Sequence, residues 1–143
     1  MNILGINYGG HDTSAAVMVN GKLLAACEEE RYINDKHTRI FPVNAINDCL
    51  KMSGLTIQDI DRAAFCYKPD LLLKIDGPVR NMRRDLLTEE SFKEVLSEYT
   101  GYTGPVDFYE HHICHLASAY YPSGFENALL MSNDGVGEVL CSL

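Results

Sequence analysis

The chain has 143 residues with a formal net charge of −8, and 46% of its residues are hydrophobic. This length and composition suit one globular domain with a core of its own. The negative charge disfavours binding to a phosphate backbone, and no apolar run approaches the roughly 20 residues that cross a bilayer. We therefore expect neither a nucleic-acid partner nor a membrane span.

The N-terminus and the cysteines indicate a cellular compartment. The first residues lack the basic stretch and small-residue cleavage site of a signal peptide. The five cysteines are an odd number, and no two of them form a CxxC pair. Reduced thiols in a cytoplasmic protein are the expectation.

The first part of the chain predicts three strands, at residues 2–8, 14–19 and 22–28. Asn20 and Gly21 separate the second and third runs. Both residues tolerate a positive φ, as the two central positions of a type I′ turn require. We therefore expect an antiparallel hairpin here.

Helices alternate with strands in the rest of the chain. We expect helices at 42–52, 89–99 and 111–121, and strands at 61–67, 106–110, 128–131 and 139–142. Pro42 suits the first position of a helix, and Gly54 suits a left-handed cap. Pro122 is expected to end its helix at residue 121.

This alternation predicts an α/β fold, with a mixed five-stranded sheet and helices packed on it. The apolar run at 128–131 is expected to be a buried strand, and it opens a new hairpin. We therefore expect one lobe at 1–126 and the first strands of a second lobe at 127–143. Apolar surface around Leu129, Leu130 and Leu140 would then be exposed and favour dimers.

Three histidines, His111, His112 and His115, lie at the start of a predicted helix. His111 and His115 are about 40° apart on one helical face, opposite a face with Ile113 that we expect to pack on the sheet. Two imidazoles one turn apart can bind one metal ion, although two exposed polar residues explain the spacing equally well. His112 lies off that face, which indicates a structural role.

Asp134 follows the predicted strand 128–131 and precedes a turn with Gly135 and Gly137. A carboxylate at such a strand end is well placed to hold a metal or approach a phosphate. Imidazoles together with a carboxylate suit iron, manganese or zinc better than calcium.

The loop after the first strand contains Gly10, His11 and Asp12. A glycine lets backbone N–H groups approach a phosphate, but the spacing matches neither a Walker nor a Rossmann loop, so a plain turn is the alternative. His11 beside Asp12 is either an acid–base group or a hydrogen-bonded turn pair. We interpret residues 28–31 and 36–37 as charged surface.

Taken together, these motifs resemble the NodU/CmcH-type carbamoyltransferases. The matching residues are Gly5-Ile6-Asn7, Gly10-His11-Asp12, Glu29-Glu30-Arg31-Tyr32, Lys36-His37, His111-His112-Ile113-Cys114-His115, Ala117 to Phe125, and Asp134 to Glu138. The resemblance implies a ribonuclease-H-like lobe of the actin/hexokinase-like (ASKHA) superfamily, similar to the universal tRNA-threonylcarbamoylation protein.

The resemblance also implies a chemistry. His111, His115 and Asp134 would bind a divalent metal, Fe²⁺ in first place and Mn²⁺ or Zn²⁺ as alternatives, that contacts nucleotide phosphates. Carbamoyl phosphate and ATP would yield carbamoyl adenylate, which passes its carbamoyl group to a hydroxyl of a small-molecule acceptor. His11 is the implied base for the acceptor, and Lys36 is the implied charge stabiliser.

Gly10, Asp12, Gly135 and Gly137 are the implied nucleotide- or substrate-binding residues. Family members are far longer, so we expect this chain to need the remainder of the enzyme or a partner lobe for turnover. The alternatives are a threonylcarbamoyl transferase acting on tRNA and a non-catalytic lobe that acts through a partner. The net charge of −8 favours a small-molecule acceptor.

Overall fold

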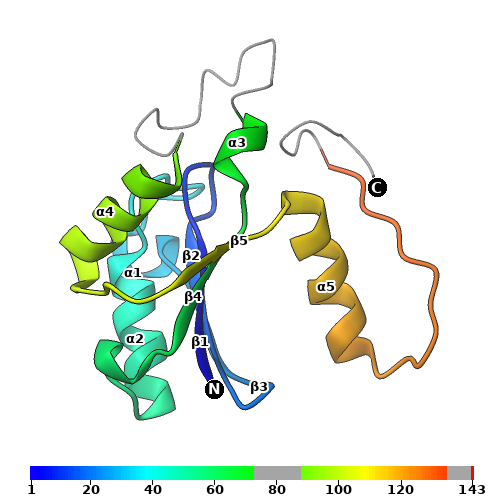
Figure 1. Ribbon diagram of the computed structural model, residues 1–143, viewed down its shortest axis with the longest axis horizontal. Coiled ribbons are helices and arrows are strands. Elements are labelled where there is room, and N and C mark those ends of the chain that lie inside the picture. The colour runs from blue at the N-terminus through cyan, green and yellow to red at the C-terminus, as the bar shows by residue number, and fades with distance from the viewer. Residues whose placement is uncertain (73–87, 135–142) are drawn as a thin grey trace.

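The computed structural model describes residues 1–72, 88–134 and 143, and within them five strands form one mixed sheet (Figure 1). The strands are β1 (Asn2–Asn7), β2 (Ser14–Val19), β3 (Lys22–Glu28), β4 (Arg62–Phe65) and β5 (Val106–Phe108). Their order across the sheet is β3-β2-β1-β4-β5. This confirms the predicted α/β fold, and the order is that of a ribonuclease-H-like lobe.

An antiparallel meander forms one side of the sheet. β1 pairs with β2, and β2 pairs with β3, both antiparallel. Asn20 and Gly21 connect β2 to β3 with φ of 49° and 80°. Positive φ at both positions is what a type I′ turn demands, so the predicted hairpin is confirmed.

The other side of the sheet is parallel and positions the candidate site. β4 pairs parallel with β1, and β5 pairs parallel with β4. The carboxyl ends of β1, β4 and β5 therefore lie at one edge of the sheet. Ligand sites of open α/β sheets form at such an edge, outside the carboxyl ends of the strands.

Two amphipathic helices cover one face of the sheet. These are α2 (Val43–Ser53) and α4 (Glu89–Thr100), close to the predicted bounds. Pro42 precedes α2, and Gly54 ends it with φ of 68°, as predicted. The Thr88 hydroxyl caps α4 by accepting a hydrogen bond from the Ser91 backbone N–H.

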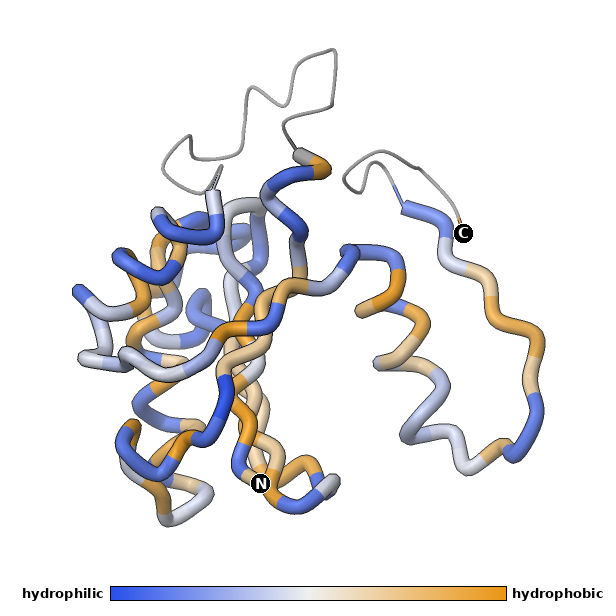
Figure 2. The backbone as a smooth tube through the Cα atoms, viewed as in Figure 1, coloured by the Kyte–Doolittle hydropathy of each residue, from blue (hydrophilic) through white to orange (hydrophobic). Residues whose placement is uncertain are grey.

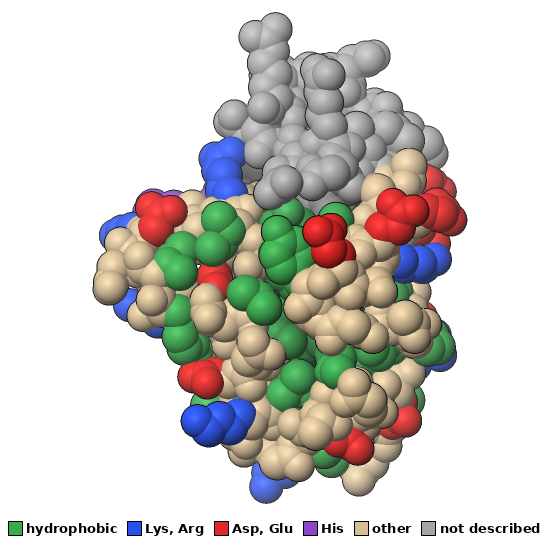
Figure 3. All heavy atoms as spheres, turned by 90° about the vertical axis from the view of Figure 1, so that its left-hand side faces the viewer, with side chains coloured by type: hydrophobic (Ala, Val, Ile, Leu, Met, Phe, Trp, Pro, Cys, Tyr) green, Lys and Arg blue, Asp and Glu red, His purple; other side chains and the backbone are tan. Residues whose placement is uncertain are grey.

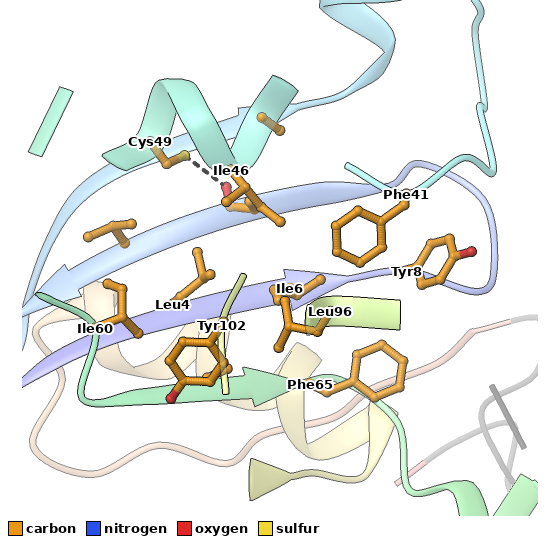
Figure 4. Close-up of a cluster of buried hydrophobic side chains, with 14 of the residues drawn as sticks. Leu4, Ile6, Tyr8, Phe41, Ile46, Cys49, Ile60, Phe65, Leu96 and Tyr102 are labelled. Carbon is orange, nitrogen blue, oxygen red and sulfur yellow. Dashed lines mark hydrogen bonds between the residues drawn. The ribbon is translucent and has the colours of Figure 1, made fainter. Parts of the chain in front are cut away.

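The core lies between these helices and the sheet. Figure 4 shows Leu4 and Ile6 of β1 beneath Ile46 of α2, with Leu96 of α4 beside them. The Cys49 thiol donates to the backbone carbonyl of Ala15 at 3.3 Å and joins α2 to β2. On the surface over these helices, acidic and basic side chains are scattered among apolar and uncharged ones (Figure 3).

Three short elements escaped the sequence pattern: α1 (Glu30–Ile33), the 3₁₀ helix η1 (Ile57–Asp59) and α3 (Pro69–Leu72). Each has only three or four residues, too few to show a helical period. α1 ends at Asn34, which takes a left-handed φ of 54°.

Helix α5 (His111–Ser123) runs two residues beyond its predicted end. Pro122 lies inside its last turn, where the proline φ is compatible with a helix and only one terminal hydrogen bond is lost. Gly124, with φ of 73°, ends the helix instead. In the described parts of the chain, no helix is long and apolar enough to span a membrane.

The prediction of a buried strand at 128–131 is wrong. These residues form neither a helix nor a strand, and Leu129 is 100% exposed. An apolar run becomes a buried strand only where another strand pairs with it and a core covers it, and no described residue does either. The segment instead returns alongside α5 (Figures 1 and 2). The exposed apolar surface predicted at Leu129 and Leu130 is confirmed.

The structure describes little of the last predicted hairpin. Ser132 and Leu143 exchange both backbone hydrogen bonds, at 2.9 and 3.0 Å, as opposed residues of antiparallel strands do. The predicted strand 139–142, Leu140, Gly135 and Gly137 lie outside the described residues.

Candidate metal centre and the adjacent histidine loop

Helix α5 begins directly beyond β5 and carries the histidine pair to the carboxyl edge of the sheet. The backbone N–H of Cys114 donates to the Glu110 carbonyl at 3.1 Å, which closes the first helical turn. His111 and His115 are one turn apart, and their ring centroids lie 4.4 Å from each other. The predicted pairing of these two imidazoles is therefore present.

Asp134 completes a triangle of potential ligand atoms. Its Oδ2 lies 3.0 Å from His111 Nε2 and 3.2 Å from His115 Nε2. The two Nε2 atoms are 2.9 Å apart. The three residues that the sequence singled out as metal ligands thus converge on one point, although 19 positions separate Asp134 from His115.

The edges of this triangle match the spacing of three ligands around one metal ion. Two Nε2–H groups aimed at one oxygen would bring two positive hydrogens together between neighbouring nitrogens. Ligand atoms about 2.1 Å from an ion are about 3.0 Å apart at right angles and about 3.4 Å apart at a tetrahedral angle. The observed 2.9–3.2 Å is closer to the right-angle spacing, so these residues could supply three neighbouring ligands to an ion.

Tyr67 supports this centre and was not predicted to do so. Its ring stacks on the His111 imidazole, with centroids 4.6 Å apart and planes 8° from parallel. A side chain added at Gly10 would lie 3.2 Å from the Tyr67 hydroxyl, so a larger residue would crowd this tyrosine. The segment after β4 thereby packs against the helix that carries His111, and the loop after β1 lies close to the Tyr67 hydroxyl.

His112 has the structural environment that the sequence indicated. It is 3% exposed, and its Nδ1 lies 2.7 Å from the Ser132 hydroxyl oxygen. Ser132 is itself buried, at 5% exposure. The bond joins α5 to the segment that leads to Asp134.

A second cluster, which we call the histidine loop, consists of His11, Asp12 and His37. His11 Nδ1 lies 2.6 Å from Asp12 Oδ2, and His37 Nδ1 lies 2.7 Å from Asp12 Oδ1. An ionised carboxylate can only accept, so each Nδ1 carries the proton and each neutral ring keeps its Nε2 lone pair. The hydrogen bond with His11, and then that with His37, lower the pKa of Asp12 below its ordinary 3.8.

The backbone of the histidine loop takes uncommon conformations. Asp12 and His37 have φ of 58° and 59°, in the left-handed region that L-residues seldom adopt. Asn7 donates from its side-chain amide to the Asp12 carbonyl at 2.9 Å, and Glu30 accepts from the His37 backbone N–H at 3.0 Å. Such conformations persist only where surrounding contacts enforce them, as at functional sites.

The hydrogen-bonded pair that the sequence offered as one interpretation of His11 and Asp12 is present, but the sequence interpretation of His37 was charged surface. A loop 25 positions away brings His37 to Asp12, which no local pattern shows. Lys36 lies in the same turn as His37, with its side chain exposed. No hydrogen bond or ion pair joins Lys36 to another described residue.

The interpretation of residues 28–31 as charged surface is wrong for Glu29. Its side chain is fully buried and accepts hydrogen bonds from the Ala45 backbone N–H at 2.8 Å and the Asn44 side-chain amide at 2.6 Å. It therefore satisfies backbone groups at the start of α2 and complements the helix dipole. A run of three glutamates hides this role.

The expected packing of α5 on the sheet through Ile113 is also wrong. Ile113 is exposed, and the residues of α5 that face the sheet are Cys114 and Ser118. They line a groove of about 530 Å³ over small sheet residues that include Gly5 and Ala64. At 100° per residue, Cys114 and Ser118 lie on the same side of the helix as His111 and His115. The helix period therefore identified the histidine pair, but the expectation that a face opposite to it packs on the sheet was wrong.

Comparison with known proteins identifies the class of this lobe. Residues 2–76 and 79–143 match the family described as Carbamoyltransferase N-terminus. Because the match covers nearly the whole chain, the protein belongs to this family. The resemblance to carbamoyltransferases is confirmed.

Two curated relatives are similar over almost all of the chain. The "Uncharacterized protein sll1178" of Synechocystis is 34% identical over 96% of this chain and 26% of its own length. The "Nodulation protein NolNO" of Sinorhizobium fredii is 30% identical over 93% of this chain and 21% of its own length. The chain thus spans about a quarter of the length of these relatives.

Among solved structures, YeaZ from Pseudomonas aeruginosa is similar, with a TM-score of 0.49 and 15% sequence identity. The similarity covers 85% of this chain and 49% of YeaZ.

Proposed function

We propose that the chain forms the N-terminal part of an ATP-dependent carbamoyltransferase, in which His111, His115 and Asp134 hold one divalent metal ion. Family membership supports the reaction class, and the triangle of ligand atoms carries the metal assignment. Two imidazoles and one carboxylate at right angles suit Fe²⁺ best, with Mn²⁺ and Zn²⁺ as alternatives.

The proposed co-substrates are carbamoyl phosphate and ATP. Water cleaves carbamoyl phosphate to carbamate and phosphate, and the carbamate oxygen then bonds to the α-phosphorus of ATP, displaces pyrophosphate and gives carbamoyl adenylate. When bound, the ion would supply positive charge that offsets the negative charge of the nucleotide phosphates. Tyr67 holds the His111 ring in a fixed plane, so the imidazole does not have to be ordered when ligand arrives. The binding of adenine is assigned to the part of the enzyme that the longer relatives contain.

Transfer to the acceptor is assigned to the histidine loop. The acceptor hydroxyl oxygen bonds to the carbamoyl carbon, the bond from that carbon to the adenylate oxygen breaks, and AMP leaves. The hydroxyl proton passes to Nε2 of His11, which is available because Asp12 binds the proton on Nδ1. Lys36 is the candidate that offsets negative charge on the carbamoyl oxygens, and the backbone of Gly10 is the candidate that approaches substrate.

The acceptor is proposed to be a small molecule with a free hydroxyl group, and the setting is proposed to be the cytoplasm. The exposed side chains of the histidine loop support an acceptor site: His11 is 68% exposed and His37 63%. A hydroxyl compound can reach both imidazoles from solvent. The net charge of −8 disfavours a tRNA acceptor.

The experiment supplies the remaining lobe in trans, from the Synechocystis relative with its matching quarter deleted. Transfer of the carbamoyl group from labelled carbamoyl phosphate to a panel of sugars is measured anaerobically with ATP and Fe²⁺. We expect transfer with the wild-type chain, none with His111→Ala/His115→Ala, and strongly reduced transfer with His11→Ala. Equal transfer with the double variant would contradict the metal assignment, and no transfer with any chain would favour a non-catalytic lobe.

A further inference from the structure

We propose that His112 and Ser132 are positioning residues of the metal centre. Their buried hydrogen bond holds the segment that carries Asp134 against the helix that carries His111 and His115. The inference rests on the proposed metal site and adds to it two residues that contact no ion themselves.

The pattern of burial shows that the segment leading to Asp134 is anchored at Ser132. Every residue from 121 to 131 is exposed, and so are Asn133 and Asp134. Ser132 is the one buried residue of this stretch. The carboxylate of Asp134 therefore lies two positions beyond the point where the returning segment is anchored.

Ser132 is held from two directions. Its hydroxyl contacts His112 at 2.7 Å, and its backbone N–H and carbonyl exchange hydrogen bonds with Leu143 at 2.9 and 3.0 Å. The side chain fixes the segment to α5, while the backbone fixes its direction. A buried polar contact of this kind allows few alternative arrangements, because each partner left alone would be an unsatisfied buried group.

The three histidines of α5 thus have separate tasks that follow from helical geometry. Successive residues turn by about 100°, so His112 cannot face the same point as its neighbour His111. His111 and His115 are directed at Asp134 Oδ2, and His112 is directed at Ser132. His111 is therefore a proposed ligand itself, whereas His112 positions the segment that carries the ligand Asp134.

The energetic consequence concerns the free protein. Without the anchor, Asp134 would end an exposed segment with many conformations, and metal binding would have to order it. With the anchor, the carboxylate is already within 3.2 Å of both imidazoles. Pre-ordering of a ligand raises affinity by removing this cost from the binding step.

The experiment measures Fe²⁺ affinity of the full chain by anaerobic equilibrium dialysis. We expect Ser132→Ala and His112→Phe each to weaken binding about 10- to 100-fold, as loss of outer partners of metal ligands does. His112→Asn keeps a polar atom near the position of Nδ1 and should recover most of the affinity. Ser53→Ala is the matched control, because the Ser53 hydroxyl donates within its own helix to the Cys49 carbonyl at 2.7 Å.

The outcomes separate the inference from the site on which it rests. If the wild-type chain binds no Fe²⁺, the metal site itself fails. If the wild type binds and both Ser132→Ala and His112→Phe bind within about twofold of it, the positioning role is overturned while the site stands. Thermal unfolding of each variant is followed in parallel, and if His112→Phe does not fold, Ser132→Ala decides, because it removes a single oxygen atom.

Discussion

Two histidines and one aspartate lie together at two places in the molecule, and the two clusters differ in geometry. At the metal centre, His111 and His115 present Nε2 to a single oxygen of Asp134. In the histidine loop, His11 and His37 present Nδ1 to different oxygens of Asp12. In the first arrangement, both Nε2 atoms and the carboxylate oxygen meet at one point. In the second, both Nδ1–H groups donate to the carboxylate, so the Nε2 atoms face away from it.

Burial separates the clusters further. The side chain of His111 is 13% exposed and lies under the Tyr67 ring, while that of His11 is 68% exposed. His115 and Asp134 are more exposed, at 50% and 41%, so His111 is the enclosed member of its cluster. An enclosed ligand suits an ion that stays in place. An open pair of imidazoles suits a substrate that comes and goes. The two clusters have the same residues, so composition alone does not distinguish them. They differ in which imidazole nitrogen faces the carboxylate, Nε2 in one and Nδ1 in the other.

The largest expected effect compares removal of the two histidine pairs. His111→Ala/His115→Ala should weaken Fe²⁺ binding by at least about 100-fold, because two of the three protein ligands are lost and even outer partners cost up to that much. His11→Ala/His37→Ala should leave the affinity unchanged. Iron retained per chain after anaerobic dialysis measures both. Equal losses in the two variants would mean that the clusters share one ion or that neither binds it.

The second effect concerns the ring protons. In wild type the neutral rings of His11 and His37 should carry their proton on Nδ1, because Asp12 accepts from both. In Asp12→Asn the amide can donate to Nδ1, so the proton should move to Nε2 in at least one ring. Nitrogen NMR of the imidazoles reads this directly. An unchanged tautomer in the variant would remove Asp12 as the group that orients His11.

Fe²⁺ affinity serves as the control for that variant. Asp12→Asn should bind the ion within about twofold of wild type, since the loop has no ligand at the metal centre. Asp134→Asn should weaken binding about 10-fold or more, because an amide is a poorer ligand for a divalent ion than a carboxylate. A large effect of Asp12→Asn on iron would contradict the separation of the two clusters.

The smallest effect is on acid stability. The pKa of Asp12 lies below its ordinary 3.8 in the folded chain, so its contacts stabilise the fold above that value and are lost as pH falls through the lowered pKa. The His11→Ala/His37→Ala variant lacks the two hydrogen bonds that lower the pKa of Asp12, so it lacks this contribution to stability. Its stability should therefore fall less steeply than that of wild type below about pH 4. Chemical unfolding at pH 6 and pH 3 measures the difference, which solvent screening keeps small; a steeper fall in the variant would oppose this assignment.

Local patterns predicted much of the fold. The Asn20-Gly21 turn and the Gly54 cap each depend on a few adjacent residues, so their conformations could be derived without the rest of the chain. The candidate metal ligands could also be named from the sequence, because helical spacing links His111 to His115 and Asp134 precedes a glycine turn. Convergence of the two parts on one point required the structure.

Tertiary proximity accounts for what the sequence did not show. His37 joins Asp12 from a separate loop, Tyr67 stacks on His111 from the segment after β4, and Glu29 turns inward to the start of α2. In each case the partner is remote in sequence, and the local pattern alone indicates a polar or apolar surface. The error at 128–131 has the opposite cause, since the apolar run was read correctly but nothing described covers it.

The most direct test of the central claim is X-ray absorption of the Fe²⁺-loaded chain. The right-angle triangle of His111, His115 and Asp134 predicts roughly six nitrogen and oxygen ligands at about 2.1 Å, with the scattering signature of imidazoles. That spectrum should persist in His11→Ala/His37→Ala and disappear in His111→Ala/His115→Ala. A chain that takes up no iron, or a spectrum that survives loss of His111 and His115, would show that these residues do not form a metal centre.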